Sequence, residues 1–388
     1  MMILLITISG CSDKYDRTQQ QSEVKNYDSS MTGLDTSEVG IDSISLKDFF
    51  SFNKKIDEKV DRIFDKMTDD ERIAQMIITS YGSLGNSEVY VSELIRRKRI
   101  GGVLMLGGSK EGFTNAIKRF NSISDSAGGI SLIFSADAEP SLINKKISGV
   151  KKFGPTNTIK NEKDCEIVAN DISDILKSIG VNQNYAPVCD FPYNKEIIGD
   201  RSYGKNEKDL VKLATEFVKV TQNNSIIATA KHFPGHGNVK GDSHKEIVYI
   251  KGDLKELNVF KEIIDAGVIS VMVGHIAIEN NEKYNTNGLP STLSRKIVTD
   301  VLKNELGFKG LVVTDAMNMV AVSKFQTPSL KAIEAGCDMI LMPSDEYKLI
   351  LSVKEKMEND PGFKEKIYES VKKIIRVKEI LIHNLYIN

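Results

Sequence analysis

The stretch ISLIFSAD, residues 130–137, is apolar over most of its length and ends in an aspartate. Seven further β-rich, mostly apolar runs occur along the chain, at residues 74–80, 101–106, 181–188, 226–233, 268–278, 311–317 and 338–344. Strands that are apolar at nearly every position, rather than at alternate positions, are typical of a parallel sheet buried on both faces. The eight runs therefore predict eight buried parallel strands.

Helical periodicity separates most of these runs. We expect helices at residues 111–124, 162–178, 207–222, 254–265, 295–305 and 329–335. Thr68 to Glu71 form a capping-box pattern, and Gly180 and Gly336 stand just past predicted helix ends. No glycine-rich phosphate loop follows the first strand, so the pattern favours an α/β fold of the (β/α)8 TIM-barrel type over a doubly wound sheet. We place this single domain at residues 46–388.

The overall composition excludes some classes of protein. The chain of 388 residues is 40% hydrophobic, enough for a buried core, and 52 basic against 53 acidic side chains leave no field that would attract nucleic acid. We therefore expect no nucleic-acid partner. Cys165, Cys189 and Cys337 lie far apart and show no metal-ligand spacing, which predicts buried small hydrophobic residues rather than a disulfide framework.

The first residues form an apolar run that ends in Ile8-Ser9-Gly10-Cys11. This resembles the lipobox of a bacterial lipoprotein, so we expect a signal peptide at residues 1–10, a lipidated Cys11 and a polar tether at residues 11–45. The protein would then lie at the cell envelope, facing the periplasm or exterior, with the lipid as its only membrane attachment. Because no Lys or Arg precedes the apolar run, a frayed terminus of a cytoplasmic protein is the alternative.

Polar side chains collect where the predicted strands end. Asp137, Lys231, His232, His275 and Asp315 all stand at or just after the end of a run. In a (β/α)8 barrel these ends meet at one mouth, where the chemistry takes place. A single aspartate there could cap the following helix, but capping does not explain a lysine or a histidine. The pattern predicts a polar site at the barrel mouth.

Five blocks of sequence resemble glycoside hydrolase family 3, and in particular its β-N-acetylglucosaminidase branch. They read NYAPVCD (184–190), IGDRSYG (198–204), KHFPGHGNVKGDSH (231–244), GLVVTDAMNM (310–319) and AIEAGCDMILMP (332–343). The histidine-rich block is the most specific to this branch. The similarity covers about residues 56–381, and it implies a single catalytic barrel domain that acts on glycosides.

The resemblance also implies catalytic roles. Asp315 would be the nucleophile of a retaining mechanism, and His244 the general acid/base, oriented by Asp242. An imidazole titrates near neutrality, so it can protonate a glycosidic oxygen and later deprotonate water, while a carboxylate on its other nitrogen holds the tautomer. Considered without the resemblance, Asp315 would more readily be interpreted as a helix cap.

Four residues are implied to bind the sugar: Asp137, Arg201, Lys231 and His232. Either Asp190 or His275 would complete the pocket. The guanidinium of Arg201 offers a rigid fork of donors suited to neighbouring sugar oxygens. Its alternative role is an ion pair with Asp200 or Asp190 that braces a loop.

A metal hydrolase built on His232, His236 and His244 is a rival from another class, since three histidines can hold a catalytic zinc. Pro234 and Gly235 argue against it, because they interrupt the helix that would place two of the histidines on one face. No glutamate follows in the usual zinc-hydrolase pattern. We expect no metal and no organic cofactor.

A sugar-binding lipoprotein that has lost activity is a second rival. After the third strand the family usually reads Asp-x-Glu-Gly-Gly with an arginine four residues on, whereas this chain reads DAEPSLINKKI, residues 137–147. Pro140 and Ser141 replace both glycines, and Lys145 or Lys146 must stand in for the arginine. Proline and a non-glycine residue restrict the backbone, so the loop under the sugar is expected to differ in shape.

Taken together, the residues and the resemblance predict a monomeric, retaining, exo-acting β-N-acetylglucosaminidase. Its partners would be N-acetylglucosamine-containing oligosaccharides, and with a lipid anchor these would be cell-wall fragments such as muropeptides. The family includes phosphorolytic members, and a histidine acid/base does not repel an incoming phosphate as a carboxylate would. A phosphorolytic enzyme is therefore kept as an alternative.

Overall fold

Eight parallel strands lie side by side in the computed structural model, which describes residues 44–242 and 246–385. Their order around the sheet is β11 (Leu311–Thr314), β9 (Ser270–Val273), β7 (Ile227–Phe233), β6 (Gln183–Asn184), β4 (Ile133–Ala136), β2 (Gly102–Met105), β1 (Ile77–Tyr81) and β12 (Ile340–Leu341). The two edges meet where Val313 pairs with Met339, and the Thr314 N–H donates to the Met339 carbonyl at 3.1 Å. The sheet is a nearly closed barrel, and the predicted fold is confirmed.

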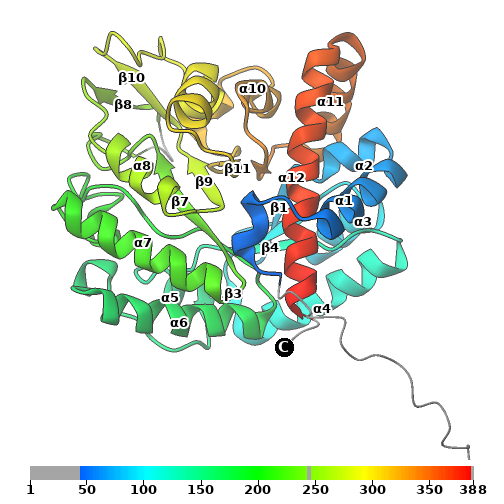
Figure 1. Ribbon diagram of the computed structural model, residues 1–388, viewed down its shortest axis with the longest axis horizontal. Helices are drawn as coiled ribbons and strands as arrows, with labels where there is room; N and C mark the ends of the chain where they lie inside the picture. The colour runs from blue at the N-terminus through cyan, green and yellow to red at the C-terminus, as the bar shows by residue number, and fades with distance from the viewer. Residues whose placement is uncertain (1–43, 243–245, 386–388) are drawn as a thin grey trace, which may run out of the picture. The chain divides into compact units, whose positions relative to one another are not determined.

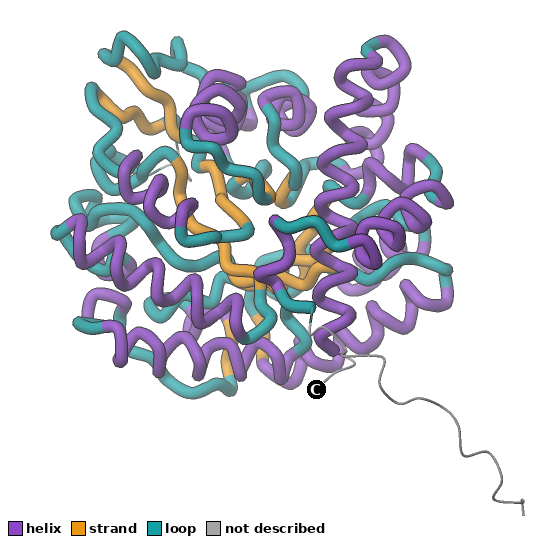
Figure 2. Tube along the Cα trace, viewed as in Figure 1, coloured by secondary structure: helices purple, strands orange, loops and turns teal. Residues whose placement is uncertain are grey.

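Helices surround these strands (Figures 1 and 2). The longer ones are α1 (Lys54–Lys66), α2 (Asp69–Ala74), α3 (Glu88–Arg96), α4 (Lys110–Ser126), α6 (Glu162–Ile179), α7 (Glu207–Asn223), α8 (Leu257–Asp265), the π-helix η5 (Lys296–Glu305), α10 (Pro328–Ala335), α11 (Glu346–Asn359) and α12 (Pro361–Leu385). The short ones are η1 (Leu46–Phe50), α5 (Ile143–Lys146), η2 (Thr156–Thr158), η3 (Gly199–Arg201), η4 (Ser291–Leu293) and α9 (Val320–Ser323). All six predicted helices are present, with ends within three residues of those expected.

Local chemistry explains where the helices begin and end. In α6, the Asn161 side chain accepts the Asp164 N–H at the start, and Gly180 ends the helix with a left-handed φ of 96°. Residues spaced three or four apart along α6, among them Ile172 and Leu176, are buried against the barrel. The predicted capping box also forms, since Thr68 and Glu71 each accept the other's backbone N–H.

One predicted strand is wrong in its extent. Residues 268–278 were expected to form a single strand, but the chain divides at Gly274 and His275 into β9 and β10 (Ile276–Glu279). β10 leaves the barrel and pairs in parallel with β8 (Val248–Lys251). A second short pair, β3 (Gly108–Ser109) with β5 (Ile147–Ser148), was not predicted. The apolar residues of β10 are therefore buried outside the barrel wall, which a continuous apolar run does not reveal.

Helix α12 packs along α1 and η1, so the last part of the chain covers one of the first (Figure 1). Lys378 of α12 is 2% exposed, and its Nζ donates to Gln75 Oε1 at 2.6 Å and to the Gly101 carbonyl at 2.8 Å. Gly101 immediately precedes β2, so this lysine lies at the end of the barrel opposite the mouth. Burial lowers the pKa of Lys378 to about 7, against a smaller opposing effect of Glu379.

The remaining expectations concern cysteines and the membrane. Cys165, Cys189 and Cys337 are buried and free, as predicted. Cys11 and the whole expected signal peptide and most of the tether lie outside the described residues. Among the helices that the structure describes, none has the length and apolar character needed to cross a bilayer.

Candidate active site

The mouth of the barrel brings together the polar residues that follow the strands. Asp137 follows β4, His275 follows β9, and Asp315 follows β11. Lys231 and His232 lie near the end of the long strand β7. Because all eight strands are parallel, these positions share one end of the barrel. The strand topology therefore brings to one mouth the four residues expected there: Asp137, Lys231, His232 and Asp315.

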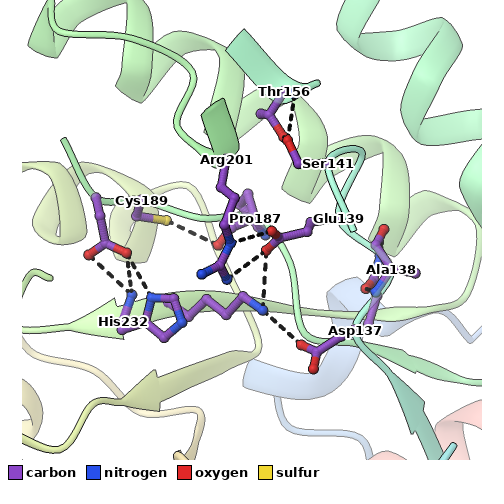
Figure 3. Close-up of polar contacts among 12 residues, drawn as sticks. Asp137, Ala138, Glu139, Ser141, Thr156, Pro187, Cys189, Arg201 and His232 are labelled. Carbon is purple, nitrogen blue, oxygen red and sulfur yellow. Dashed lines mark hydrogen bonds and ion pairs between the residues drawn. The ribbon is translucent and has the colours of Figure 1, made fainter. Parts of the chain in front are cut away.

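A buried network of four charges forms the centre of this mouth (Figure 3). Lys231 Nζ lies 2.8 Å from Asp137 Oδ1 and 3.3 Å from Glu139 Oε2. Glu139 also binds Arg201, which donates through Nη2 to Glu139 Oε2 at 3.1 Å and through Nε to Oε1. Lys231 and Glu139 are only 2% and 1% exposed, so this central pair is shielded from bulk water, while Asp137 and Arg201 are partly exposed at either side.

The network keeps all four groups ionised. Burial alone would raise the pKa of the carboxyls of Asp137 and Glu139, but Lys231 and Arg201 bring both below their usual values. Burial alone would lower the pKa of Lys231, yet the two carboxylates raise it above its ordinary value. Of the two lysines expected near this loop, Lys146 lies near enough to help lower the pKa of Asp137, and Lys145 is exposed. Lys231 can therefore offer a fixed positive charge to a hydroxyl.

The partner of Arg201 differs from both alternatives drawn from the sequence, which were Asp190 and Asp200. It is Glu139, two residues after Asp137, so the arginine braces the loop after β4. Arg201 is still partly exposed, and its Nη1 donates to the Ile197 carbonyl at 3.0 Å. The guanidinium is therefore fixed in orientation by a carboxylate and a carbonyl at the edge of the mouth.

Asp190 is a buried organiser of the two neighbouring histidines and is fully shielded from solvent. Its Oδ2 lies 2.7 Å from His232 Nδ1, and its Oδ1 accepts the His236 N–H at 2.7 Å. Burial and the charges of Arg201 and Lys231 lower the pKa of His232 well below its ordinary value, so the ring is neutral at pH 7. With Nδ1–H donating to Asp190, Nε2 of His232 is an acceptor.

His275 also forms hydrogen bonds with protein groups. It is fully buried; Nδ1 lies 2.8 Å from the Thr292 hydroxyl, and Nε2 lies 3.0 Å from the Ala316 carbonyl. A carbonyl only accepts, so Nε2 carries the proton and Nδ1 accepts from the hydroxyl. Asp190 and His275 are both buried and hydrogen-bonded to protein groups, and the expectation that one of them completes the sugar pocket stays a prediction.

Asp315 lies directly after β11 and is only partly buried. One carboxylate oxygen accepts the N–H of Ala316 at 2.8 Å, and the Asp315 N–H donates to the Val273 carbonyl at 2.9 Å. Its negative charge acts on both His232 and His236, which places it in the same cluster. His275 holds the adjoining Ala316 carbonyl, so the backbone that carries Asp315 is fixed on both sides.

The acid/base pair predicted from the histidine-rich block falls at the edge of the described chain. Asp242 is half-buried, and its carbonyl accepts the Glu246 N–H at 3.1 Å. His244 lies outside the described residues, so its distance from Asp242 is not defined. Upstream in the same segment, Gly235 and Gly237 pack closely on Glu256, and Glu256 Oε1 accepts the Phe191 N–H at 3.4 Å.

Pro140 and Ser141, which replace the two glycines of the family pattern after β4, have defined surroundings in the structure. Pro140 is buried, and the Ser141 hydroxyl donates to the Asp200 carbonyl at 3.0 Å and accepts the Thr156 N–H at 2.9 Å. Ser141 therefore links the loop after β4 to the residue that precedes Arg201. Its contact with Thr156 is drawn in Figure 3.

The residues that the structure describes contain no group of three or more His, Cys, Asp or Glu side chains arranged to hold a metal ion. Of the three histidines of the zinc alternative, His232 and His236 have ring centroids 5.8 Å apart, and His232 directs Nδ1 at Asp190. The third, His244, lies outside the described residues.

Two buried carboxyls were missed in the sequence. Glu139 could have been found, because it stands two residues after Asp137 and an alternating backbone turns both side chains the same way. Glu256 gives no such signal, since it lies in the charged stretch KGDLKEL and reads as a solvated residue. In the structure it is 1% exposed, and burial raises its pKa to about 7, reinforced by the charge of Asp190.

Comparison with known proteins gives the site its context. The chain is 31% identical over 282 residues to β-hexosaminidase A of Pseudoalteromonas piscicida, covering 65% of this chain and 47% of that protein. It is 32% identical over 182 residues to a β-hexosaminidase of Nitrosomonas eutropha, covering 44% of this chain and 50% of that one. The chain thus spans about half the length of these two relatives.

Solved structures show the same fold. A glycoside hydrolase family 3 β-N-acetylglucosaminidase from Paenibacillus sp. str. FPU-7 superposes with a TM-score of 0.75 at 27% identity, over 82% of this chain and 63% of that one. A β-N-acetylhexosaminidase from Beutenbergia cavernae superposes with a TM-score of 0.73 at 22% identity, over 81% of this chain and 99% of that one. Residues 68–377 match the glycosyl hydrolase family 3 N terminal domain, and the chain belongs to this family.

Proposed function

We propose that the chain is a retaining, exo-acting β-N-acetylglucosaminidase that hydrolyses terminal β-linked N-acetylglucosamine. The observation that carries the proposal is the buried Asp137–Lys231–Glu139–Arg201 network, which stands at the same mouth as the carboxylate of Asp315. The similar proteins named as β-hexosaminidases and the related β-N-acetylglucosaminidase structure support this substrate class.

Sugar recognition follows from the fixed charges of the network. Lys231 donates from a rigid position, Asp137 accepts, and the neutral His232 offers Nε2 as an acceptor. A terminal sugar presents neighbouring hydroxyls that are donors and acceptors at once, so it can satisfy all three groups. Because the protein holds these groups in position before the sugar binds, little side-chain conformational entropy is lost on binding. Three fixed groups that together satisfy the hydroxyls of one terminal sugar suit the end of a glycan chain, in keeping with exo action.

The chemistry would proceed in two displacements. A carboxylate oxygen of Asp315 attacks the anomeric carbon while His244 gives a proton to the departing glycosidic oxygen, and a covalent glycosyl-Asp315 forms. His244 then removes a proton from water, whose oxygen attacks the anomeric carbon and releases Asp315. Asp242 stabilises the imidazolium that is present before the first step and forms again in the second. Two inversions leave the β configuration unchanged.

The test is release of nitrophenol from p-nitrophenyl N-acetyl-β-glucosaminide by the full chain, compared with Asp315→Asn. The asparagine cannot form the ester intermediate, so turnover should fall by about a thousandfold or more while the fold is retained. Asp125→Asn, on the exposed surface of α4, is the matched control and should behave as wild type. Wild-type rates in Asp315→Asn would show that Asp315 is not the nucleophile.

The same assay separates the alternatives. A folded wild-type protein that binds N-acetylglucosamine without turnover would support the sugar-binding protein suggested by Pro140 and Ser141. Turnover that requires phosphate and yields a sugar phosphate would support a phosphorolytic enzyme instead, the activity named for one structural neighbour that shares the fold at 20% identity. Hydrolysis in phosphate-free buffer supports the proposal made here.

We also propose that Cys11 is lipidated and that the enzyme acts as a monomer at the cell envelope on muropeptide-like fragments. The support is the sequence pattern Ile8-Ser9-Gly10-Cys11 with a polar stretch after it. Metabolic labelling with radioactive palmitate should mark the wild type and leave Cys11→Ser unlabelled. Equal absence of label and recovery of both proteins in the soluble fraction would contradict the anchor.

A further inference from the structure

Two loops at the barrel mouth are joined by one buried asparagine. Asn194 lies in the segment that follows β6 and is 6% exposed. Its backbone N–H donates to the Gly237 carbonyl at 2.7 Å, and its side-chain Nδ2 donates to the Gly241 carbonyl at 3.1 Å. Gly237 and Gly241 belong to the segment after β7, and Gly241 immediately precedes Asp242. Asn194 thus holds both ends of the stretch that leads to the proposed acid/base pair.

The same asparagine organises the turn that carries Arg201. Its Oδ1 accepts the Ile197 N–H at 3.4 Å, and its carbonyl accepts the N–H groups of Ile198 at 2.9 Å and Gly199 at 3.0 Å. The Ile197 carbonyl in turn accepts Arg201 Nη1 at 3.0 Å, and the Ile198 carbonyl accepts the Arg201 N–H at 2.8 Å. Side chain and backbone of Asn194 therefore fix the sugar-binding side of the site as well.

The two segments are also in direct backbone contact. A methyl group added at Gly237 would lie 2.0 Å from the Phe191 carbonyl oxygen and 2.7 Å from Glu256 Oε1. His236, just before this glycine, places Nδ1 3.4 Å from Asn194 Nδ2. A shift of one segment therefore displaces the other. The Asn194 amide bridges them at Gly241, and the Asp190 carboxylate does so at the His236 N–H.

We infer that Asn194 is a positioning residue that fixes Asp242, and through it the acid/base step, relative to the Arg201 side of the site. The inference rests on the proposed function, because it concerns the proton transfer of that reaction. A general acid must stand within hydrogen-bond reach of the leaving oxygen, and small displacements of it reduce the rate steeply. Loss of the Nδ2 donor would free the Gly241 carbonyl and the backbone that leads into Asp242.

The test compares Asn194→Asp with the wild type on two aryl N-acetyl-β-glucosaminides. Aspartate keeps the shape and the acceptor oxygen but places an oxygen where Nδ2 donates to Gly241. The phenyl glycoside, whose leaving group needs protonation, should lose about ten- to a hundredfold in kcat/KM. The 2,4-dinitrophenyl glycoside needs little protonation and should lose less than about threefold in kcat/KM. Asn194→Ala adds no charge but also removes the Oδ1 acceptor of the Ile197 N–H, so both substrates should lose and the phenyl glycoside should lose more.

Asn182→Asp is the matched control. Asn182 precedes β6 at the opposite end of the barrel, where Nδ2 donates to the Leu132 carbonyl at 3.4 Å and Oδ1 accepts the Phe134 N–H at 2.9 Å. The change therefore removes the same kind of side-chain-to-backbone bond far from the mouth. It should lower the unfolding temperature without changing the ratio of the two substrates.

Azide gives a second readout that folding defects do not produce. It displaces Asp315 from the glycosyl-enzyme by forming a bond between its nitrogen and the anomeric carbon, and no proton has to be removed. Azide should therefore accelerate turnover of the dinitrophenyl glycoside by Asn194→Asp and form the glycosyl azide, with little effect on the wild type. Equal losses on both substrates and no azide effect would overturn the inference while leaving the proposed function standing. A wild type that turns over neither substrate would overturn both.

Discussion

Replacing Glu139 by glutamine should test how strongly the charge network holds the mouth together. The variant keeps the shape of the side chain but removes the more buried of the two negative charges, leaving Asp137 to face both Lys231 and Arg201. The glutamine amide nitrogen would also face the N–H groups of Arg201 or Lys231. Both sides are donors, so no hydrogen bond can form there. A neutral buried cluster thus becomes one with an uncompensated positive charge.

The magnitude follows from the burial. Glu139 is 1% exposed and accepts two hydrogen bonds from Arg201, so water cannot replace what is lost. Removing one partner of a buried ion pair costs about 3–5 kcal/mol, out of a typical total stability of about 5–15 kcal/mol. We expect Glu139→Gln to lower the free energy of unfolding by an amount in that range. The sugar affinity should fall as well, because Lys231 loses a constraint on its position.

Urea unfolding of the wild type and Glu139→Gln provides the assay, with Glu93→Gln as matched control. Glu93 pairs with Arg96 at 2.6 Å and also with Arg97, but it is 39% exposed and screened by solvent, so its loss should cost much less than the loss of Glu139. A loss in Glu139→Gln no larger than in Glu93→Gln would refute the argument that burial makes the network stabilising.

The stability difference between wild type and Glu139→Gln should also depend on pH, in a direction set by the pKa of Glu139. Burial would raise the pKa of Glu139, but Lys231 and Arg201 bring it below its usual value. A carboxyl with a lowered folded pKa stabilises the protein above its unfolded pKa, about 4.3 for glutamate, and this stability is lost as the pH falls toward the folded pKa. The gap between wild type and Glu139→Gln should therefore be constant near neutrality and narrow in acid.

Two further predictions concern buried groups elsewhere. Burial lowers the pKa of Lys378 to about 7, so between that pH and the unfolded value near 10.5 the unfolded chain binds more protons. The stability of the wild type relative to Lys378→Met should rise there by up to about 1.4 kcal/mol per pH unit in urea unfolding, and a pH-independent difference would contradict this. Gly237→Ala forces a methyl group against the Phe191 carbonyl, so its kcat/KM on the nitrophenyl glycoside should fall by about a hundredfold or more, whereas Gly362→Ala, with 3.5 Å of clearance, should match wild type.

The barrel was predictable because its strands are buried on both faces. Each of the eight apolar runs overlaps a barrel strand, and Asp137, Lys231 and Asp315 were predicted at the mouth because parallel strands end together. The extent of the strands was less predictable. In the run at residues 181–188 only Gln183 and Asn184 form a continuous strand, and beyond them Val188 makes an isolated parallel bridge to Lys231.

The polar contacts inside the mouth could not be predicted from the sequence. Which carboxylate pairs with Arg201 depends on how loops from different strands meet, and their residues lie about sixty positions apart along the chain. Glu256 reads as a surface residue, because local composition does not show that the segment after β7 folds over it. His275 was expected in the pocket for its position after β9, yet tertiary packing engages both of its nitrogens.

Pro140 and Ser141 were the reason to consider a protein that binds sugar without cleaving it, and their surroundings weigh against that alternative. Ser141 uses its hydroxyl to tie the loop to Asp200, beside Arg201, so the residue that replaces a glycine adds a link to the site. Asp137, two residues before Glu139, still reaches Lys231 at 2.8 Å, which shows that proline has not turned the carboxylates away from the mouth. A loop that keeps both carboxylates in place can serve the same chemistry with a stiffer backbone, and this favours an enzyme over a binding protein.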